Sequence, residues 1–151
     1  MGFFDIFKKK SMSDIRLVES YTSDLTYGGI AIDIDYNVEE SKEHLPEDFS
    51  VLQNEGIENI IRSRYLPWFK GEEFKDRDDD LILEGLKPYS IAYRYGPIEK
   101  KYTHTETYEK GGEFSFFFEC GNDYIRDMME SVAMTLYVYN GQIVGTDGYE
   151  V

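Results

Sequence analysis

The chain of 151 residues has the length of one ordinary domain, and its 16% of aromatic residues excludes a chain that is disordered by composition. Its one cysteine, Cys120, excludes an internal disulfide and suits a protein of the reducing cytoplasm. A net charge of −14 argues against a nucleic-acid-binding protein, because binding to phosphates needs a basic surface.

The first residues form a segment of their own. Phe3, Phe4 and Phe7 stand at helical spacing and are followed by lysines at 8–10. We predict a short amphipathic segment over residues 1–12, which either caps the domain or touches a membrane surface through residues 1–10. No transmembrane segment is predicted, because the longest charge-free stretch, 131–145, is shorter than the roughly 20 residues that span a bilayer. Residues 13–151 are predicted to form a single α+β domain.

Two strands are predicted at the start of this domain. The first is short and covers residues 15–19. The second covers residues 27–36, where isoleucines at 30, 32 and 34 alternate with Ala31, Asp33 and Asp35. This period of two is typical of a strand with one buried face and one face in water.

A central helix is predicted after an acidic loop over residues 37–48. Ser50 and Gln53 have the spacing of a capping box, so the helix begins at Ser50, and Pro67 ends it near Leu66. Its apolar stripe is predicted to pack on the sheet. The stripe consists of Ile57, Ile60, Ile61, Tyr65 and Trp68. A second acidic loop, 71–80, leads to a short helical turn over 81–86 that is capped by Asp79 or Asp80 and stopped by Pro88.

The C-terminal half is predicted to be mostly β. Alternating patterns indicate strands over 89–95, 102–108 and 114–118, with turns at Gly96-Pro97 and Gly111-Gly112. A hairpin follows, in which Asn140-Gly141 forms a type I′ turn and Ile143 lies opposite Val138. The predicted fold is therefore α+β: a meandering antiparallel sheet of about six or seven strands with the central helix, about 50–66, on one face.

No catalytic, cofactor-binding or metal-binding residue is predicted. Asp33-x-Asp35-x-Asn37 begins like a calcium-binding loop, but Val38 and His44 stand where the loop needs glycine and glutamate. The acidic run 76–80 fails in the same way. Cys120 continues the predicted buried face of the strand 114–118, which favours a buried apolar residue over a reactive thiolate.

The acidic segments and one aromatic residue are the candidate partner-binding features. Trp68 stands at the end of the predicted helix, beside an acidic loop, where it either plugs the core or anchors an interface. The two acidic segments, 33–58 and 72–84, would form a negative patch if they lay side by side. The candidate residues are Asp33, Asp35, Glu39, Glu40, Trp68, Asp78, Asp79 and Asp80.

The predicted helix with its segment Leu66-Pro67-Trp68-Phe69 and the hairpin 136–143 resemble small uncharacterised bacterial α+β domains of unknown function. Some domains of this kind are associated with toxin and immunity loci. The resemblance implies an immunity or accessory protein.

Three functions are compatible with the sequence. The first is a non-enzymatic acidic binding protein, for example an immunity or accessory protein, that binds a basic protein partner. The second is an enzyme or small-ligand-binding protein with an aromatic-lined pocket in the sheet, to which Tyr93, Tyr95, His104 and Tyr108 contribute. The third is a peripheral membrane accessory protein that acts through residues 1–10.

Overall fold

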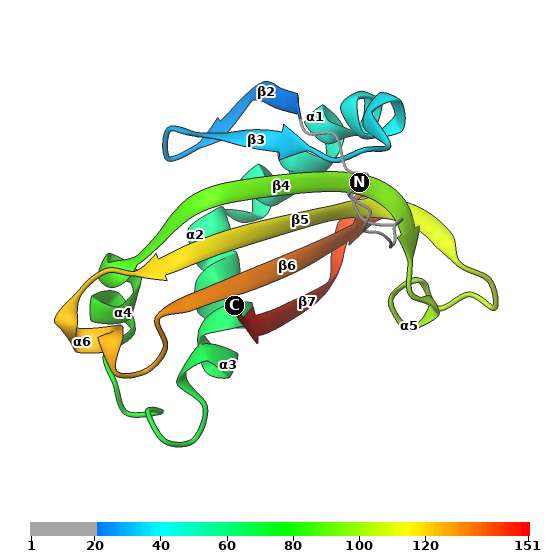
Figure 1. The fold of residues 1–151 in the computed structure, drawn as a ribbon. Helices are drawn as coiled ribbons and strands as arrows, with labels where there is room; N and C mark the ends of the chain where they lie inside the picture. Colours follow the sequence, from blue (N-terminus) through cyan, green and yellow to red (C-terminus); the bar gives the residue numbers. More distant parts are fainter. Residues whose placement is uncertain (1–20) are drawn as a thin grey trace, which may run out of the picture.

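The computed structural model describes residues 21–151 and shows an α+β fold built on one six-stranded sheet (Figure 1). The amphipathic segment predicted at 1–12 and the strand predicted at 15–19 lie outside the described residues. Within residues 21–151, no helix is both long and apolar enough to cross a membrane.

The sheet is mixed, so the prediction of a purely antiparallel meander is wrong. The strand order is β2-β3-β4-β5-β6-β7, and every neighbouring pair is antiparallel except β3 and β4. In the parallel pair, Ile32 lies opposite Ile91 and Ile34 lies opposite Tyr93. Parallel neighbours need a long crossover connection, and the helical segment between these two strands supplies it.

The first two strands form a hairpin rather than the single strand predicted over 27–36. β2 (Tyr21–Tyr27) and β3 (Ile30–Ile34) are joined by Gly28 and Gly29, which both have positive φ. Ile32 and Ile34 are buried and Asp33 lies on the opposite face, as the alternation predicts.

The crossover is helical over a longer range than predicted. α1 (Val38–Glu55) occupies the segment predicted as an acidic loop, and Ser50 lies inside this helix instead of capping one. Leu45, Phe49 and Leu52 are buried at steps of three and four residues, which gives α1 the apolar stripe that it needs to pack.

Gly56, with φ of 92°, breaks the helix after α1. α2 (Ile57–Ile60), the π-helical turn η2 (Ile61–Tyr65) and α3 (Leu66–Lys70) continue the chain. Pro67 therefore does not end the helix: it lies in the first turn of α3, where a missing N–H costs no hydrogen bond. The predicted stripe from Ile57 to Tyr65 is buried, whereas Trp68 is 40% exposed.

A short helix, α4 (Asp79–Gly85), completes the crossover before the chain enters the sheet. Its N-cap is Asp78, whose side chain accepts hydrogen bonds from the backbone N–H groups of Asp80 and Leu81. The predicted cap, Asp79 or Asp80, thus lies one or two residues too late. Pro88 does not stop this helix, because β4 already begins at Leu86.

β4 (Leu86–Ile98) and β5 (Glu109–Cys120) are longer than predicted and contain the glycines that were expected to make turns. Position 112 of β5 needs a glycine, because a Cβ atom there would come within 2.2 Å of Asp48 Oδ2. The strand predicted over 102–108 is wrong, since the chain forms α5 (Lys100–Thr103) and a loop.

The C-terminal hairpin is as predicted. A short helix, α6 (Asp123–Arg126), leads from β5 to β6 (Ser131–Tyr139), which pairs with β7 (Gln142–Glu150). Asn140 and Gly141 have φ of 56° and 78°, as a type I′ turn requires, and Ile143 lies opposite Val138.

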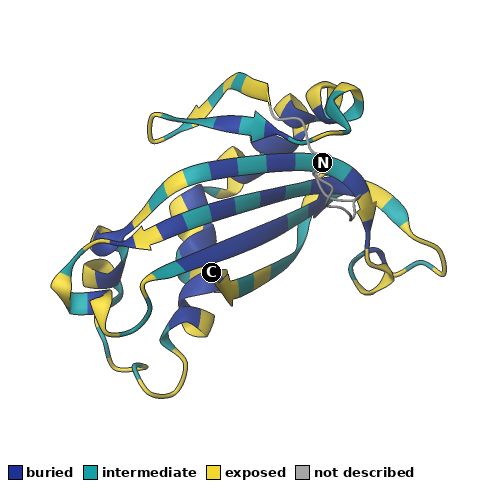
Figure 2. Ribbon diagram, in the orientation of Figure 1, coloured by how far each residue is buried: buried dark blue, intermediate teal, exposed yellow. Residues whose placement is uncertain are grey.

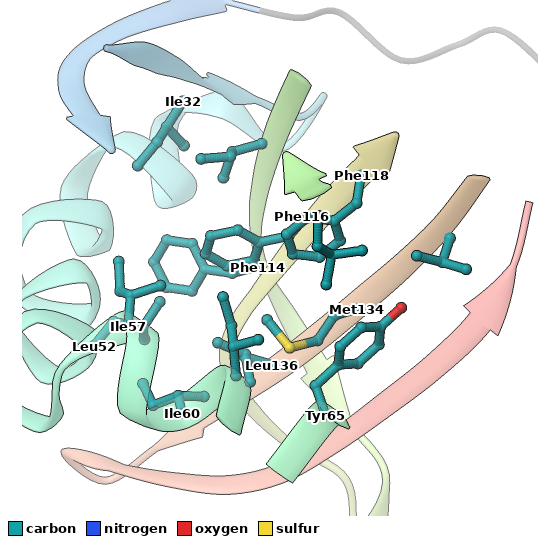
Figure 3. Packing of buried hydrophobic residues seen from close by; sticks show 14 of the residues in the cluster. Ile32, Leu52, Ile57, Ile60, Tyr65, Phe114, Phe116, Phe118, Met134 and Leu136 are labelled. Carbon is teal, nitrogen blue, oxygen red and sulfur yellow. The ribbon is translucent and has the colours of Figure 1, made fainter. Parts of the chain in front are cut away.

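Aromatic side chains from β5 form the centre of the core (Figure 3). Phe114 packs against Phe49 of α1, with ring centroids 6.1 Å apart, and Phe118 packs against Tyr65 of η2 at 5.7 Å. The side chains of β5 that alternate with these phenylalanines, such as Ser115, belong to the opposite face, which we call the outer face of the sheet. Figure 2 shows this alternation as bands along β4 and β5.

Candidate functional site

The eight predicted partner-binding residues do not gather in one place. Asp33 and Asp35 belong to β3 and its end, and Glu39 and Glu40 to the first turn of α1. The remaining four lie on or next to α3 and α4, which Figure 1 places apart from β3. These are Trp68, Asp78, Asp79 and Asp80.

The acidic segments approach each other at one point only among the contacts of the described chain. Arg62 of η2 donates to Glu58 of α2, and the same guanidinium lies 2.6 Å from Asp80 of α4. The arginine thus joins one acid from each predicted segment. Because a cation lies between the two carboxylates, this contact is a structural bridge, and the negative charge that it presents to a partner is reduced.

Asp35 also has a partner within the chain. Arg94 of β4 lies on the outer face between two carboxylates, with Nε 3.7 Å from Asp35 and Nη2 bonded to Glu113 of β5. Asp33 accepts a hydrogen bond from the Thr22 hydroxyl of β2. These contacts cross-link neighbouring strands on the outer face.

Most of the other candidate acids are engaged in the same way. Glu40 pairs with Lys110 at 2.7 Å, and Asp79 pairs with Lys70 at 2.7 Å. Asp78 is the helix cap described above. Structural contacts therefore account for most of the acids that the sequence singled out.

Trp68 both packs and remains accessible. Its ring lies 5.4 Å from the ring of Tyr65, and it covers Gly148 of β7, where a Cβ would come within 2.7 Å of the indole. Two-fifths of the residue is nevertheless exposed. Trp68 closes one end of the core and also presents aromatic surface beside the edge strand β7.

A set of exposed acids on α1 was missed. Glu39, Glu43 and Glu47 are exposed, stand four residues apart, and form no ion pair within residues 21–151. Residues at this spacing lie along one side of a helix, and we call them the α1 acidic stripe. Only Glu39 was a candidate, because the segment was interpreted as a loop and its helical spacing was not considered.

Few cations of the described residues are left without a partner to balance this stripe. Within residues 21–151, every lysine and arginine except Lys42, Lys87 and Lys100 forms an ion pair. Lys42 lies over the ring of Tyr21 at 5.3 Å, and Lys100 lies over the ring of Tyr108 at 5.7 Å. Within this part of the chain, the charge that remains without a partner is mainly negative.

Asp48 is a buried carboxyl group with a structural role. Burial raises the pKa of Asp48, and the Tyr93 hydroxyl, which donates to Asp48 Oδ2 at 2.5 Å, opposes this rise. Burial and this hydrogen bond raise the pKa of Tyr93 as well. Gly112 packs directly against the carboxylate, which leaves no space on that side for a substrate. The pair ties α1 to the sheet.

The sites considered for thiol chemistry and for a ligand are dispersed. Burial raises the pKa of Cys120 to about 11, and the residue belongs to the core, as predicted. His44 stacks on the ring of Tyr95, with ring centroids 3.8 Å apart, and His104 is exposed directly after α5. Neither histidine is therefore placed to act as a base for the Cys120 thiol. Tyr108 is exposed, so it does not share a pocket with the buried Tyr93.

One cleft lies between η2, α3 and the start of α4 and has a volume of about 320 Å³. Arg62 and Lys70 line it, but both already pair with acids of α4. Such compensated cations make a poor anion site. Within residues 21–151, no cluster of three or more His, Cys, Asp or Glu residues is arranged to hold a metal ion.

No protein family, no curated protein and no solved structure matches this chain.

Proposed function

We propose that this protein is a non-enzymatic binding protein whose acidic surface engages a basic protein partner. The observation that supports the proposal is the uneven use of charge. Thirty acids stand against 16 bases, and nearly all bases of the described chain are held in ion pairs or over aromatic rings. Complementary charge of this kind speeds association with a partner and selects against anionic competitors.

The α1 acidic stripe is the surface that we assign to this partner. Glu39, Glu43 and Glu47 project from a helix that is anchored to the sheet, so their spacing is preset before binding. A preset array loses less conformational entropy on binding than a loop would. We include the immunity or accessory role in the proposal, with a basic toxin as the partner and the cytoplasm as the place of action, because the sequence resemblance implies it.

The experiment compares capture of proteins on the immobilised chain at about 0.1 M and about 1 M salt, where exposed charges are screened to different extents. The test variant changes Glu39, Glu43 and Glu47 to glutamine. The control changes three other exposed acids to glutamine and so removes the same charge from elsewhere. The control acids are Glu106, Glu119 and Glu130.

We expect a partner that is captured at low salt, released at high salt, and bound about tenfold more weakly by the stripe variant than by the control, since each exposed charge pair contributes a modest amount. Equal losses in the two variants would remove the stripe as the site. Absence of any salt-sensitive partner would contradict the proposed function as a whole.

A further inference from the structure

The edge of β7 that faces away from β6 is long and lacks the lysine and proline residues that commonly block pairing with another strand. Its nine residues contain no proline, lysine or arginine. Within residues 21–151, no backbone group of β7 forms a backbone hydrogen bond outside the β6 ladder. The other edge strand of the described sheet, β2, has seven residues and an irregular register between Thr22 and Thr26.

Every second residue of such an edge strand points its N–H and C=O groups away from the sheet, where they can pair with another strand. Proteins commonly block this pairing with lysine, proline, bulges or short edge strands. β2 has such an irregularity in its middle. In β7 the register shift lies near the turn, at Val144, and the pairing from Gly145 to Glu150 is regular.

Asp147 places a fixed negative charge beside this edge. The Tyr102 hydroxyl lies 3.1 Å from one of its carboxylate oxygens, and the Tyr137 hydroxyl donates to the same oxygen at 3.1 Å. The two rings stack with centroids 4.7 Å apart, so two neighbouring hydroxyls orient the carboxylate while Asp147 itself is exposed. A cation on an added strand would meet a carboxylate that is already oriented.

Trp68 places an aromatic surface beneath the same edge on the opposite side of the sheet. Gly148, under which the indole packs, lies opposite Met134, whose side chain belongs to the core. The exposed part of the indole therefore lies on the core side of the sheet, next to β7. An added strand would extend the sheet over this ring and bury it.

We infer that the β7 edge binds an extended segment of a basic protein partner by strand addition, with a lysine or arginine next to Asp147 and a small or apolar side chain over Trp68. This inference rests on the proposed function and names a second contact of the same partner. A second copy of the chain is the weaker occupant, because two molecules of net charge −14 repel each other.

The test uses a synthetic nine-residue peptide of alternating lysine and valine, and binding is followed by the fluorescence of Trp68, the only tryptophan of the chain. Two further peptides have the same sequence but are N-methylated at every second residue, one at the lysines and the other at the valines. N-methylation removes the N–H donors along one edge of the peptide and leaves the charge unchanged. The protein variants are Asp147→Asn and, as a matched control, Glu106→Gln.

We expect the parent peptide to shift the Trp68 emission, one N-methylated peptide to bind at least about tenfold more weakly, and the other to bind within about twofold of the parent. Asp147→Asn should weaken binding about threefold to tenfold, and Glu106→Gln should not. Equal affinities for all three peptides would overturn strand addition while leaving an acidic binding surface intact. No shift of Trp68 emission at about 1 mM parent peptide would also overturn the inference.

Discussion

Tyr65 and Tyr93 are both buried tyrosines of the core, with exposed fractions of 0% and 1%, but their hydroxyl groups are in opposite situations. The Tyr65 hydroxyl is buried and has no hydrogen-bond partner among residues 21–151, and burial raises the pKa of this side chain. Figure 3 shows its ring among the apolar side chains of the core. An unsatisfied buried polar group costs about 1–3 kcal/mol. We expect Tyr65→Phe to raise the free energy of unfolding by about 1 kcal/mol.

Tyr93→Phe should have the opposite effect. It removes the only side chain that donates a hydrogen bond to Asp48 within the described chain, and Asp48 is 9% exposed. Loss of a hydrogen bond to a buried acid costs about 1.5–3 kcal/mol. The two variants delete the same atom from the same residue type, so their stabilities should differ by about 3 kcal/mol.

Urea unfolding of both variants, followed by far-ultraviolet circular dichroism, measures this difference without relying on Trp68, which lies against Tyr65. Similar slopes of the unfolding transitions would show that the comparison is valid. If Tyr65→Phe destabilises the protein by more than about 1 kcal/mol, or if Tyr93→Phe is neutral, the reasoning from hydrogen-bond satisfaction is refuted.

Further predictions concern a carboxyl, a guanidinium and a thiol. Since burial raises the folded-state pKa of Asp48, its contribution to stability is lost as the pH rises through that pKa, and Asp48→Asn should gain stability over the wild type in urea titrations as the pH rises above about 4. Arg77 holds Asp127 through two hydrogen bonds of 2.9 Å, so Arg77→Lys should speed proteolysis within 71–78 several-fold. Cys120, with its pKa raised to about 11, should react with a thiol reagent at pH 8 at least about tenfold more slowly folded than in urea.

Each of these has an outcome that contradicts it. A pH-independent difference between Asp48→Asn and the wild type would mean that Asp48 does not titrate differently on folding. Unchanged cleavage of Arg77→Lys would show that the paired guanidinium does not restrain the loop. Rapid labelling of folded Cys120 would show that its side chain is accessible.

Where a local signal was decisive, the sequence predicted the structure well. Asn140-Gly141 defined the last hairpin because positive φ at both positions is tolerated there and the flanking apolar alternation agrees. The burial of Ile32 and Ile34 followed from the same period of two. Neither depends on distant parts of the chain.

The first part of α1, before Ser50, was missed because its polar and acidic residues were interpreted as a loop. Leu45, Phe49 and Leu52 carry the helical signal, but most residues of the segment 37–48 are charged or polar. Burial against β4 and β5 then outweighs the cost of a proline inside the helix. The error also hid the α1 acidic stripe, since side chains of a loop have no common face.

The prediction of a strand over 102–108 was wrong because a period of two was given too much weight. Its threonines alternate with polar and aromatic residues, but no apolar face exists for the sheet to bury, and α5 forms instead. The parallel pairing of β3 with β4 also has no local signal, because Ile32 and Ile91 meet across the whole crossover. For the candidate site, the sequence identified the acidic residues, but only the structure shows which of them already form an ion pair with a lysine or arginine.

The parallel pairing of β3 and β4 has a consequence for how the molecule assembles. Among themselves, β4 to β7 pair in chain order through short connections, so closing their loops costs little entropy, whereas the β2-β3 hairpin can join β4 only after the crossover has folded. We expect native-state hydrogen exchange to show the hairpin opening before the four C-terminal strands. The chain would then mature from its C-terminal end, with residues 21–34 docking last against a scaffold that is already complete.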